Sequence, residues 1–289
     1  TDMAVNTLAR DIDVQLNPQA RAYLLPCIAG HVGADTAGMV LAEQPYNHDE
    51  MTLLVDVGTN AEIVLGNRHR LVACSSPTGP AFEGAQISCG QRAAAGAIER
   101  IRIDPITLEP RFQVISCELW SDTEGFDEAT AKTGITGICG SGIIEVVAEM
   151  YLAGVVTQDG VIDGGLATIN SRIQPDGRTF SYEIMPATET RGAVKIMQND
   201  IRAIQLAKAA LYAGVKLLMQ YQQVDKVDRI RFAGAFGSHI DVKYAMVLGL
   251  IPDCALDEVS SAGNAAGTGA RIALLNELSR VEIEQVVRN

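Results

Sequence analysis

The stretch Leu53-Leu-Val-Asp56-Val-Gly58-Thr59-Asn60-Ala-Glu62-Ile-Val-Leu65 decides the fold of this chain. A run of apolar residues leads to an aspartate and a Gly-Thr turn, and a second apolar run returns from that turn. This pattern is typical of two antiparallel strands joined by a tight hairpin, and a further glycine turn at 66–67 predicts a third strand. The three strands are expected over 52–57, 61–65 and 70–74.

The turn of this hairpin is suited to phosphate. Consecutive backbone N–H groups and the Thr59 hydroxyl would point at one spot, which favours an anion there. Asp56 would stand beside it, able to hold Mg²⁺ through water or to orient an attacking water. The alternative is an ordinary hairpin with a polar tip, but the flanking strands favour the phosphate site. We therefore expect Asp56, Gly58, Thr59 and Asn60 around the phosphates and metal.

A second glycine turn follows the apolar run Ile230–Ala233. Gly234 would let a flat adenine or a ribose pack against bare backbone. We expect Gly234, Ala235 and Gly237 on the adenosine side of a nucleotide site. Taken alone, this segment fits any turn between a strand and a helix.

Two glycine-rich segments, 137–142 and 263–269, precede predicted helices. They could place an anion at a helix N-terminus, with Gly140, Ser141, Gly263 and Asn264 against the nucleotide. They could instead allow two helices to cross closely at a hinge, and this packing interpretation is favoured.

The remaining segments predict an α/β chain with mixed sheets, because strands come first and then alternate with helices. The segments 29–33 and 233–237 have similar sequences. Two equivalent lobes would explain this similarity, and so would chance. We expect a linker or an irregular lead-in over 1–20 and a buried strand that runs into a glycine turn over 27–33. The other expected elements are a helix at 34–43, a functional loop at 75–90, strands at 98–103 and 112–119, a helix at 141–153, loops over 158–180, a helix at 200–222, a strand at 229–233 and helices at 241–248 and 262–278.

Composition narrows the class of protein. The chain has 289 residues and a net charge of −12, which argues against nucleic acid or an anionic membrane as the main partner. No apolar run approaches the roughly 18 residues that a spanning helix needs, and no secretory signal is visible. The six cysteines lie far apart in the sequence, as expected for small buried residues in a reducing cytoplasm.

Several common catalytic motifs are missing from the sequence. It has no GxxxxGK followed by Ser or Thr, and no GxGxxG after the first strand. The four histidines are scattered, and no HExxH is present. These observations disfavour P-loop, dinucleotide-binding and zinc-enzyme classes.

Together, the segments resemble the acetate kinase, sugar kinase, heat-shock chaperone and actin superfamily. Within it, the chain looks like the ATPase region of the reductive activators of corrinoid-dependent enzymes. The resemblance covers roughly residues 18–280. It rests on Ile28–Thr36, Leu54–Gly66, Gly79–Ala85, Gly137–Gly142, Gln205–Lys208, Phe232–Gly237 and Gly263–Ala266.

This resemblance implies two actin-like (ribonuclease H-like) lobes with mixed sheets and a nucleotide cleft between them. Residues 21–48 with 185–289 would form the lobe with the adenosine turn, and 49–184 the lobe with the phosphate hairpin. ATP and Mg²⁺ are the implied cofactors. The implied catalytic residues are Asp56, Glu62 and Glu83, and the implied metal ligands are Asp56 and Asp35.

The implied activity is ATP-dependent reduction of a corrinoid protein from Co(II) to Co(I), with this chain binding and hydrolysing ATP and docking the corrinoid protein. Activators of this kind carry a ferredoxin-type iron–sulfur domain, and no cluster ligands are found here. The cluster would then lie on a separate protein or on a domain outside this sequence. A homodimer is left open. The alternatives are a small-molecule kinase of the same superfamily and a docking module that does not hydrolyse ATP.

Overall fold

The chain folds into two compact units. The computed structural model describes residues 2–189, 191–237 and 239–288, without the side chains of Ala235 and Phe236. The first unit comprises Thr1–Ser76, Ala213–Ser238 and Pro252–Asn289, and the second comprises Pro77–Tyr212 and His239–Ile251. The expected α/β fold with mixed sheets is confirmed, since both parallel and antiparallel pairs occur.

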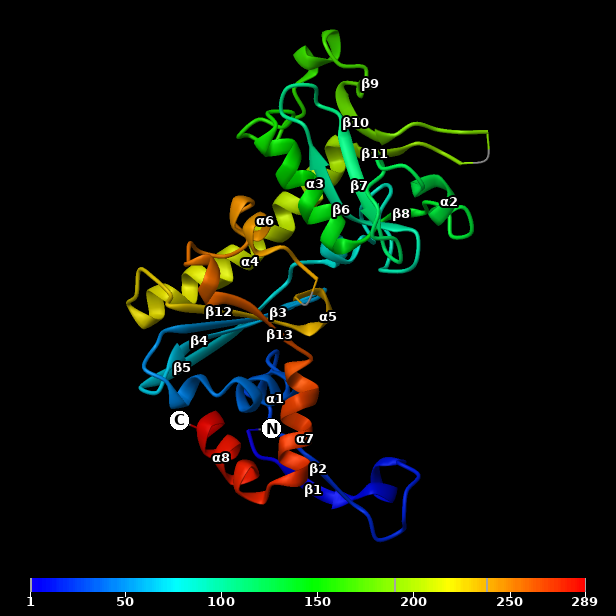
Figure 1. Cartoon of the computed structure of the whole chain (residues 1–289). Helices are drawn as coiled ribbons and strands as arrows, with labels where there is room; N and C mark the ends of the chain where they lie inside the picture. The colour runs from blue at the N-terminus through cyan, green and yellow to red at the C-terminus, as the bar shows by residue number, and fades with distance from the viewer. Residues whose placement is uncertain (1, 190, 238, 289) are drawn as a thin grey trace. The chain divides into compact units, whose positions relative to one another are not determined.

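The first unit is built on a five-stranded sheet with the order β13-β12-β3-β4-β5 (Figure 1). The predicted meander is confirmed as three antiparallel strands, and two later strands run parallel to the first of them. The strands are β3 (Thr52–Val57), β4 (Ala61–Asn67), β5 (Arg70–Ser76), β12 (Arg229–Ala233) and β13 (Val259–Gly263).

Helices cover this sheet, because its central strands are apolar on both faces. Leu54 and Val64 pack with α1 (Ala34–Glu43), α7 (Ala265–Leu275) and α8 (Glu277–Arg288), which lie together in Figure 1. Ile63 points to the opposite face, where it lies against Gly214 of α4 (Gln198–Gln222). The alternation of side chains along each strand therefore divides the core into two layers.

The N-terminal segment is more regular than expected. Instead of an irregular lead-in, β1 (Val5–Leu8) pairs with β2 (Arg21–Leu24) around a 3₁₀ turn at Ala9–Ile12. Within 27–33 the predicted glycine turn is present and is closed by a bridge between Ala29 and Val32, but the buried strand predicted to precede it does not form. The strand–turn–helix echo with 233–237 is therefore incomplete.

The second unit holds two smaller sheets, with the orders β7-β6-β8 and β11-β10-β9. The loops expected over 158–180 include strand β9 and the start of β10. The strands are β6 (Ala97–Ile103), β7 (Pro110–Val114), β8 (Gly137–Ile138), β9 (Ile173–Asp176), β10 (Thr179–Met185) and β11 (Val194–Met197). The helices are α2 (Phe126–Thr130), α3 (Gly140–Leu152) and α6 (Val242–Val247), with 3₁₀ turns at Pro80–Glu83 and Gly164–Thr168.

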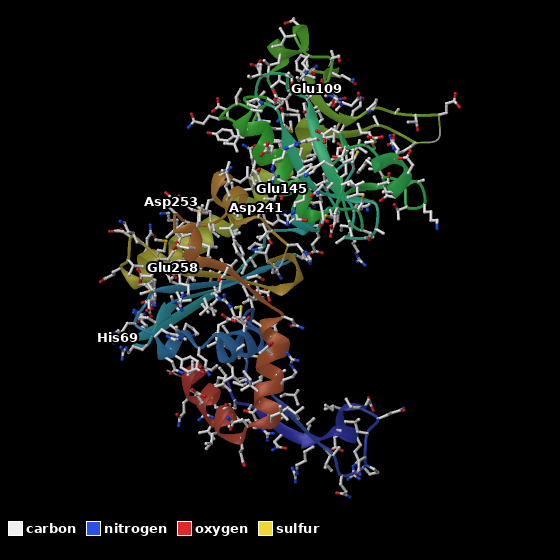
Figure 2. The ribbon with its side chains drawn as sticks, viewed as in Figure 1. His69, Glu109, Glu145, Asp241, Asp253 and Glu258 are labelled. Carbon is white, nitrogen blue, oxygen red and sulfur yellow. The ribbon has the colours of Figure 1, made fainter. Side chains whose placement is uncertain are left out.

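A buried carboxylate links α3 to the edge of β6. Glu145, labelled in Figure 2, is fully buried, and Arg100 and Arg102 donate to it at 2.5 and 2.6 Å. The backbone N–H of Ile101 donates to the same side chain at 3.0 Å. Strand β6 pairs with β8 only at Ala97 and Ile98. Beyond this pairing, the Glu145 carboxylate accepts the N–H of Ile101 that would otherwise lack a partner strand.

The boundaries of the two units differ from the lobes that the sequence suggested. The hairpin of Asp56 and the turn of Gly234 were expected on different lobes, but β3 and β12 are neighbours in one sheet. The reason is a parallel pairing between segments some 180 residues apart, from Thr52–Arg229 to Asp56–Ala233. Such long-range pairing leaves no local pattern in the sequence.

The last predicted helix, 262–278, was also placed differently. Gly263 ends β13, and Asn264 caps α7. The helix α7 ends at its C-cap Asn276, and α8 begins at the next residue. Within the described residues, no helix is both long enough and apolar enough to cross a membrane.

Candidate functional site

One row of residues crosses the whole sheet of the first unit. Gly263 of β13 lies opposite Ala233 of β12, which lies opposite Asp56 of β3. Asp56 in turn lies opposite Glu62 of β4, and Glu62 opposite Ser75 of β5. Since β3, β12 and β13 are parallel, their carboxyl ends meet at this row, which is where open α/β sheets bind ligands.

Asp56 depends on the glycine after the neighbouring strand. Gly234 has a φ of +78°, a conformation that L side chains rarely adopt. A Cβ atom at this position would lie 2.4 Å from Oδ1 of Asp56. The two strongest motifs of the sequence therefore meet, because only glycine leaves room for this carboxylate.

Three carboxylates share this end of the sheet. Burial, and then the charge of Asp35, raise the pKa of Asp56. Burial also raises the pKa of Glu62, with smaller contributions from Asp35 and Asp56, while a hydrogen bond from Ser75 opposes the shift. Among the described residues, no lysine, arginine or histidine forms an ion pair with any of the three. The uncompensated negative charge favours a cation.

The donor set fits a metal that arrives with phosphates. In the part of the chain that is described, no three His, Cys, Asp or Glu residues are grouped closely enough to hold a metal by themselves. Mg²⁺ usually takes only one or two protein carboxylates and completes its shell with water and phosphate oxygens. Asp56 with Asp35 or Glu62 would provide such a partial set.

The hairpin tip is open to solvent. Thr59 and Asn60 are exposed, and the N–H of Gly58 donates to the carbonyl of Asn60 at 2.9 Å. Asp35 lies in the first turn of α1, where it is exposed and accepts the Thr36 N–H at 2.8 Å. These groups are accessible to a ligand at the carboxyl end of β3.

The other predicted nucleotide residues of the first unit have structural roles as well. A Cβ at Gly237 would lie 2.8 Å from that of Phe232, so close packing requires this glycine. The side chain of Asn264 accepts the N–H of Gly267 at 2.9 Å and caps α7. Gly263 has a φ of +59° with open space beside it. Ala235 is the second residue of α5 (Gly234–Gly237), and its side chain lies outside the described part of the structure.

Three predicted site residues belong to the second unit. Glu83 is exposed at the end of the 3₁₀ turn Pro80–Glu83. Ser141 is buried in the first turn of α3, directly after Gly140. A Cβ at Gly142 would lie 2.4 Å from the carbonyl oxygen of Ile98, so this glycine run allows α3 to pack on β6. The close packing at 137–142 is therefore that of a helix on a strand, whereas the sequence had suggested a crossing of two helices.

Ser75 was not predicted as a site residue. Its hydroxyl donates to Oε1 of Glu62 at 3.0 Å and so orients that carboxylate. The hairpin registers could have identified it, since Glu62 lies opposite Asp56 and Ser75 opposite Glu62.

Comparison with known proteins agrees with this fold. Residues 50–289 match the family described as the C-terminal domain of RACo, the ASKHA domain. The chain therefore belongs to this family of actin-like domains.

Particular relatives carry related names. The chain is 34% identical over 283 residues, 95% of its length, to "Corrinoid activation enzyme RamQ" of Eubacterium limosum. It is 25% identical over 262 residues, 89% of its length, to "[Co(II) methylated amine-specific corrinoid protein] reductase" of Methanosarcina barkeri. A solved "Reductive activator for corrinoid,iron-sulfur protein" superimposes on 98% of the chain with a TM-score of 0.81 and 34% identity. The chain spans 44%, 45% and 43% of these three proteins, less than half of each.

Proposed function

We propose that the first unit binds Mg·ATP and that the chain takes part in the ATP-dependent reductive activation of a corrinoid protein. The observation that carries the nucleotide site is the position of Asp56 against Gly234, at the carboxyl end of parallel strands. Membership of the ASKHA family and the names of the relatives support the wider role.

Each part of the site has a chemical task in this proposal. The backbone N–H groups of residues 59 and 60 and the Thr59 hydroxyl bind phosphate oxygens in the turn that begins at Gly58. Asp56 holds the metal or orients the attacking water. Glu62 and Asp35 provide further carboxylate oxygens for the metal or the water. Gly234, Ala235 and Gly237 form the turn on the adenosine side of the site, directly after β12. Mg²⁺, when bound, supplies positive charge that neutralises the phosphates and these carboxylates.

Energy input explains why such a reaction needs a nucleotide. Reducing Co(II) to Co(I) is uphill for ordinary cellular donors, and each 59 mV of uphill one-electron transfer costs about 1.4 kcal/mol. ATP can drive the reaction only through different affinities for two states of the protein. In the proposal, those states differ in their grip on the corrinoid protein. A ferredoxin-type donor, on a separate protein or domain, supplies the electron in the cytoplasm.

The proposal is tested by measuring nucleotide binding and ATP turnover. Calorimetric titration with ATP or ADP and Mg²⁺ should show binding, and absence of binding by folded protein at about 1 mM nucleotide would overturn the site. ATP hydrolysis is then measured with and without a purified corrinoid protein in the Co(II) state. Turnover stimulated by the corrinoid protein supports the activator.

The two alternatives predict other outcomes. Turnover that requires a small-molecule phosphate acceptor would identify a kinase. Binding without any turnover would identify a docking module. Reduction itself is followed through the absorption spectrum of the corrinoid, with a low-potential chemical reductant as the electron source. ATP should increase the Co(I) fraction only when this chain is present.

A further inference from the structure

A cavity of about 280 Å³ lies within the second unit. Three short segments line it, at 88–90, 135–137 and 191–194. The first two come from glycine-rich stretches that stood out in the sequence, the loop 75–90 and the run 137–142. Neither segment belongs to the unit that holds Asp56, so the proposed nucleotide site leaves them without a function.

Close backbone contacts build the walls of this cavity. A Cβ at Gly90 would lie 2.2 Å from the carbonyl oxygen of Gly84, and one at Gly137 would lie 2.7 Å from that of Cys89. The N–H and hydroxyl of Ser88 both donate to Oδ1 of Asp200, at 2.8 and 3.0 Å. These contacts fix the lining segments before any ligand binds, which lowers the cost of binding.

Among the described residues that line the cavity, Arg191 is the one that is charged. Its Nε is buried and has no hydrogen-bond partner. Its Nη2 donates to the carbonyl oxygen of Pro186 at 3.2 Å, and no carboxylate among the described residues pairs with it. A buried, charged donor without a partner is rare in folded proteins, and where one occurs it often serves to bind an ion or a ligand.

We propose that this cavity is a second binding site, which takes a small oxyanion, a carboxylate or a phosphate, recognised by Arg191. A guanidinium forms short, charge-assisted hydrogen bonds with both kinds of oxyanion. The other described residues of the lining are uncharged, and many of them are small, so none of these repels an anion. The volume is at the lower end for ligand pockets and favours a free anion or a small metabolite that ends in one.

The test measures binding of two probes, inorganic phosphate and acetate, to the whole chain by calorimetry at constant ionic strength. Arg191→Gln removes the charge, and Arg191→Lys keeps the charge but removes the Nε donor. Arg178→Gln is the matched control, since Arg178 is exposed in the neighbouring β9–β10 turn. Circular dichroism checks that each variant is folded.

At least one probe should bind to the parent and to Arg178→Gln, with affinity at least about tenfold lower in Arg191→Gln. Arg191→Lys should lie between the two. The preferred probe identifies the oxyanion. Phosphate held at the Asp56 hairpin would survive Arg191→Gln, so equal binding by parent and variant overturns this site without touching the proposed nucleotide site. Absence of binding of both probes at about 20 mM also overturns it.

Discussion

Asp56 is held in a position that costs the folded chain stability. It is partly buried, it faces a second carboxylate across the hairpin, and the charge of Asp35 reaches it as well. Residues kept in unfavourable environments concentrate at functional sites. Removing its charge should therefore separate function from stability.

Asp56→Asn keeps the shape of the side chain and removes its charge. We expect hydrolysis of ATP to fall by roughly 100-fold or more, about 2.7 kcal/mol, which is typical for one preorganised electrostatic contact. Nucleotide affinity should change much less, because the N–H groups of the turn remain. The measurement is the hydrolysis rate per folded molecule, with corrinoid protein added if turnover requires it. Asp225→Asn, an exposed position in the same unit, is the control. A rate within about threefold of the parent would show that Asp56 is not catalytic.

The same variant should be more stable than the parent at neutral pH, without nucleotide or metal. The pKa of Asp56 is raised on folding, so its contribution to stability is present below the unfolded pKa and is lost as pH rises through the folded value. Asparagine avoids that loss. The gain in melting temperature should shrink as pH falls through the raised folded pKa of Asp56, because the parent carboxyl then becomes neutral as well. A variant less stable than the parent at pH 7 would contradict this account.

Gly234→Ala tests the contact between the two motifs. The new methyl group would be strained by the left-handed backbone conformation, and it would lie only 2.4 Å from Oδ1 of Asp56. We expect a loss of stability of about 1–3 kcal/mol and hydrolysis lowered at least about tenfold. Gly154→Ala is the control, because its φ is +75° but nothing lies within 4 Å of the added Cβ. The Gly154→Ala variant should lose stability but keep its rate of ATP hydrolysis. Equal hydrolysis rates in the two variants would show that Gly234 does not contribute to the reaction.

At the scale of elements, the crossing of α1 and α7 supports the site from one face of the sheet. A Cβ at Gly269 would lie 1.9 Å from the carbonyl oxygen of Gly38, and one at Gly38 would lie 2.9 Å from that of Ala266. The helices therefore touch backbone to backbone, and the N-terminus of α7 directly follows the carboxyl end of β13.

Gly269→Ala should destabilise the first unit by about 1–3 kcal/mol or more, because backbone cannot move aside as a side chain can. In an ordinary helix the same change would stabilise by up to about 1 kcal/mol. Gly30→Ala, where the added Cβ meets nothing within 4 Å, serves as the control. Urea unfolding of both variants measures the difference. A Gly269→Ala variant as stable as the parent would show that the two helices do not pack this closely.

Elements with a local signal could be predicted from the sequence. The meander of Thr52–Ser76 follows from apolar runs separated by glycine turns, and α4 from its apolar stripe. The pairing of β12 with β3 could not be predicted, because the sequence around Arg229 does not indicate that this residue lies opposite Thr52. Gly140 and Ser141 were ambiguous for another reason. Glycine before a helix is compatible with a phosphate site and with close packing, and the sequence does not show that Gly142 lies against the backbone of Ile98.

At the scale of the whole molecule, the division into two units allows two ligands to act on separate parts of the chain. The residues proposed for phosphate and adenosine, at 56–60 and 234–237, both belong to the first unit. The cavity of Arg191 belongs to the second. Each proposed site therefore provides a control for the other.

Hydrogen exchange of the whole chain should map the two ligands to different units. A ligand that binds only the folded state stabilises it by about 2.7 kcal/mol at 100 times its dissociation constant, which slows exchange through full unfolding of its unit about 100-fold. Mg·ADP should therefore protect the ends of β3 and β12 more than the segments 88–90 and 135–137. The preferred oxyanion should do the reverse, and Arg191→Gln should abolish its effect alone. Gly234→Ala should weaken the effect of Mg·ADP alone. Protection by Mg·ADP that is centred on the cavity of Arg191 would place the nucleotide in the second unit and contradict the assignment of Asp56.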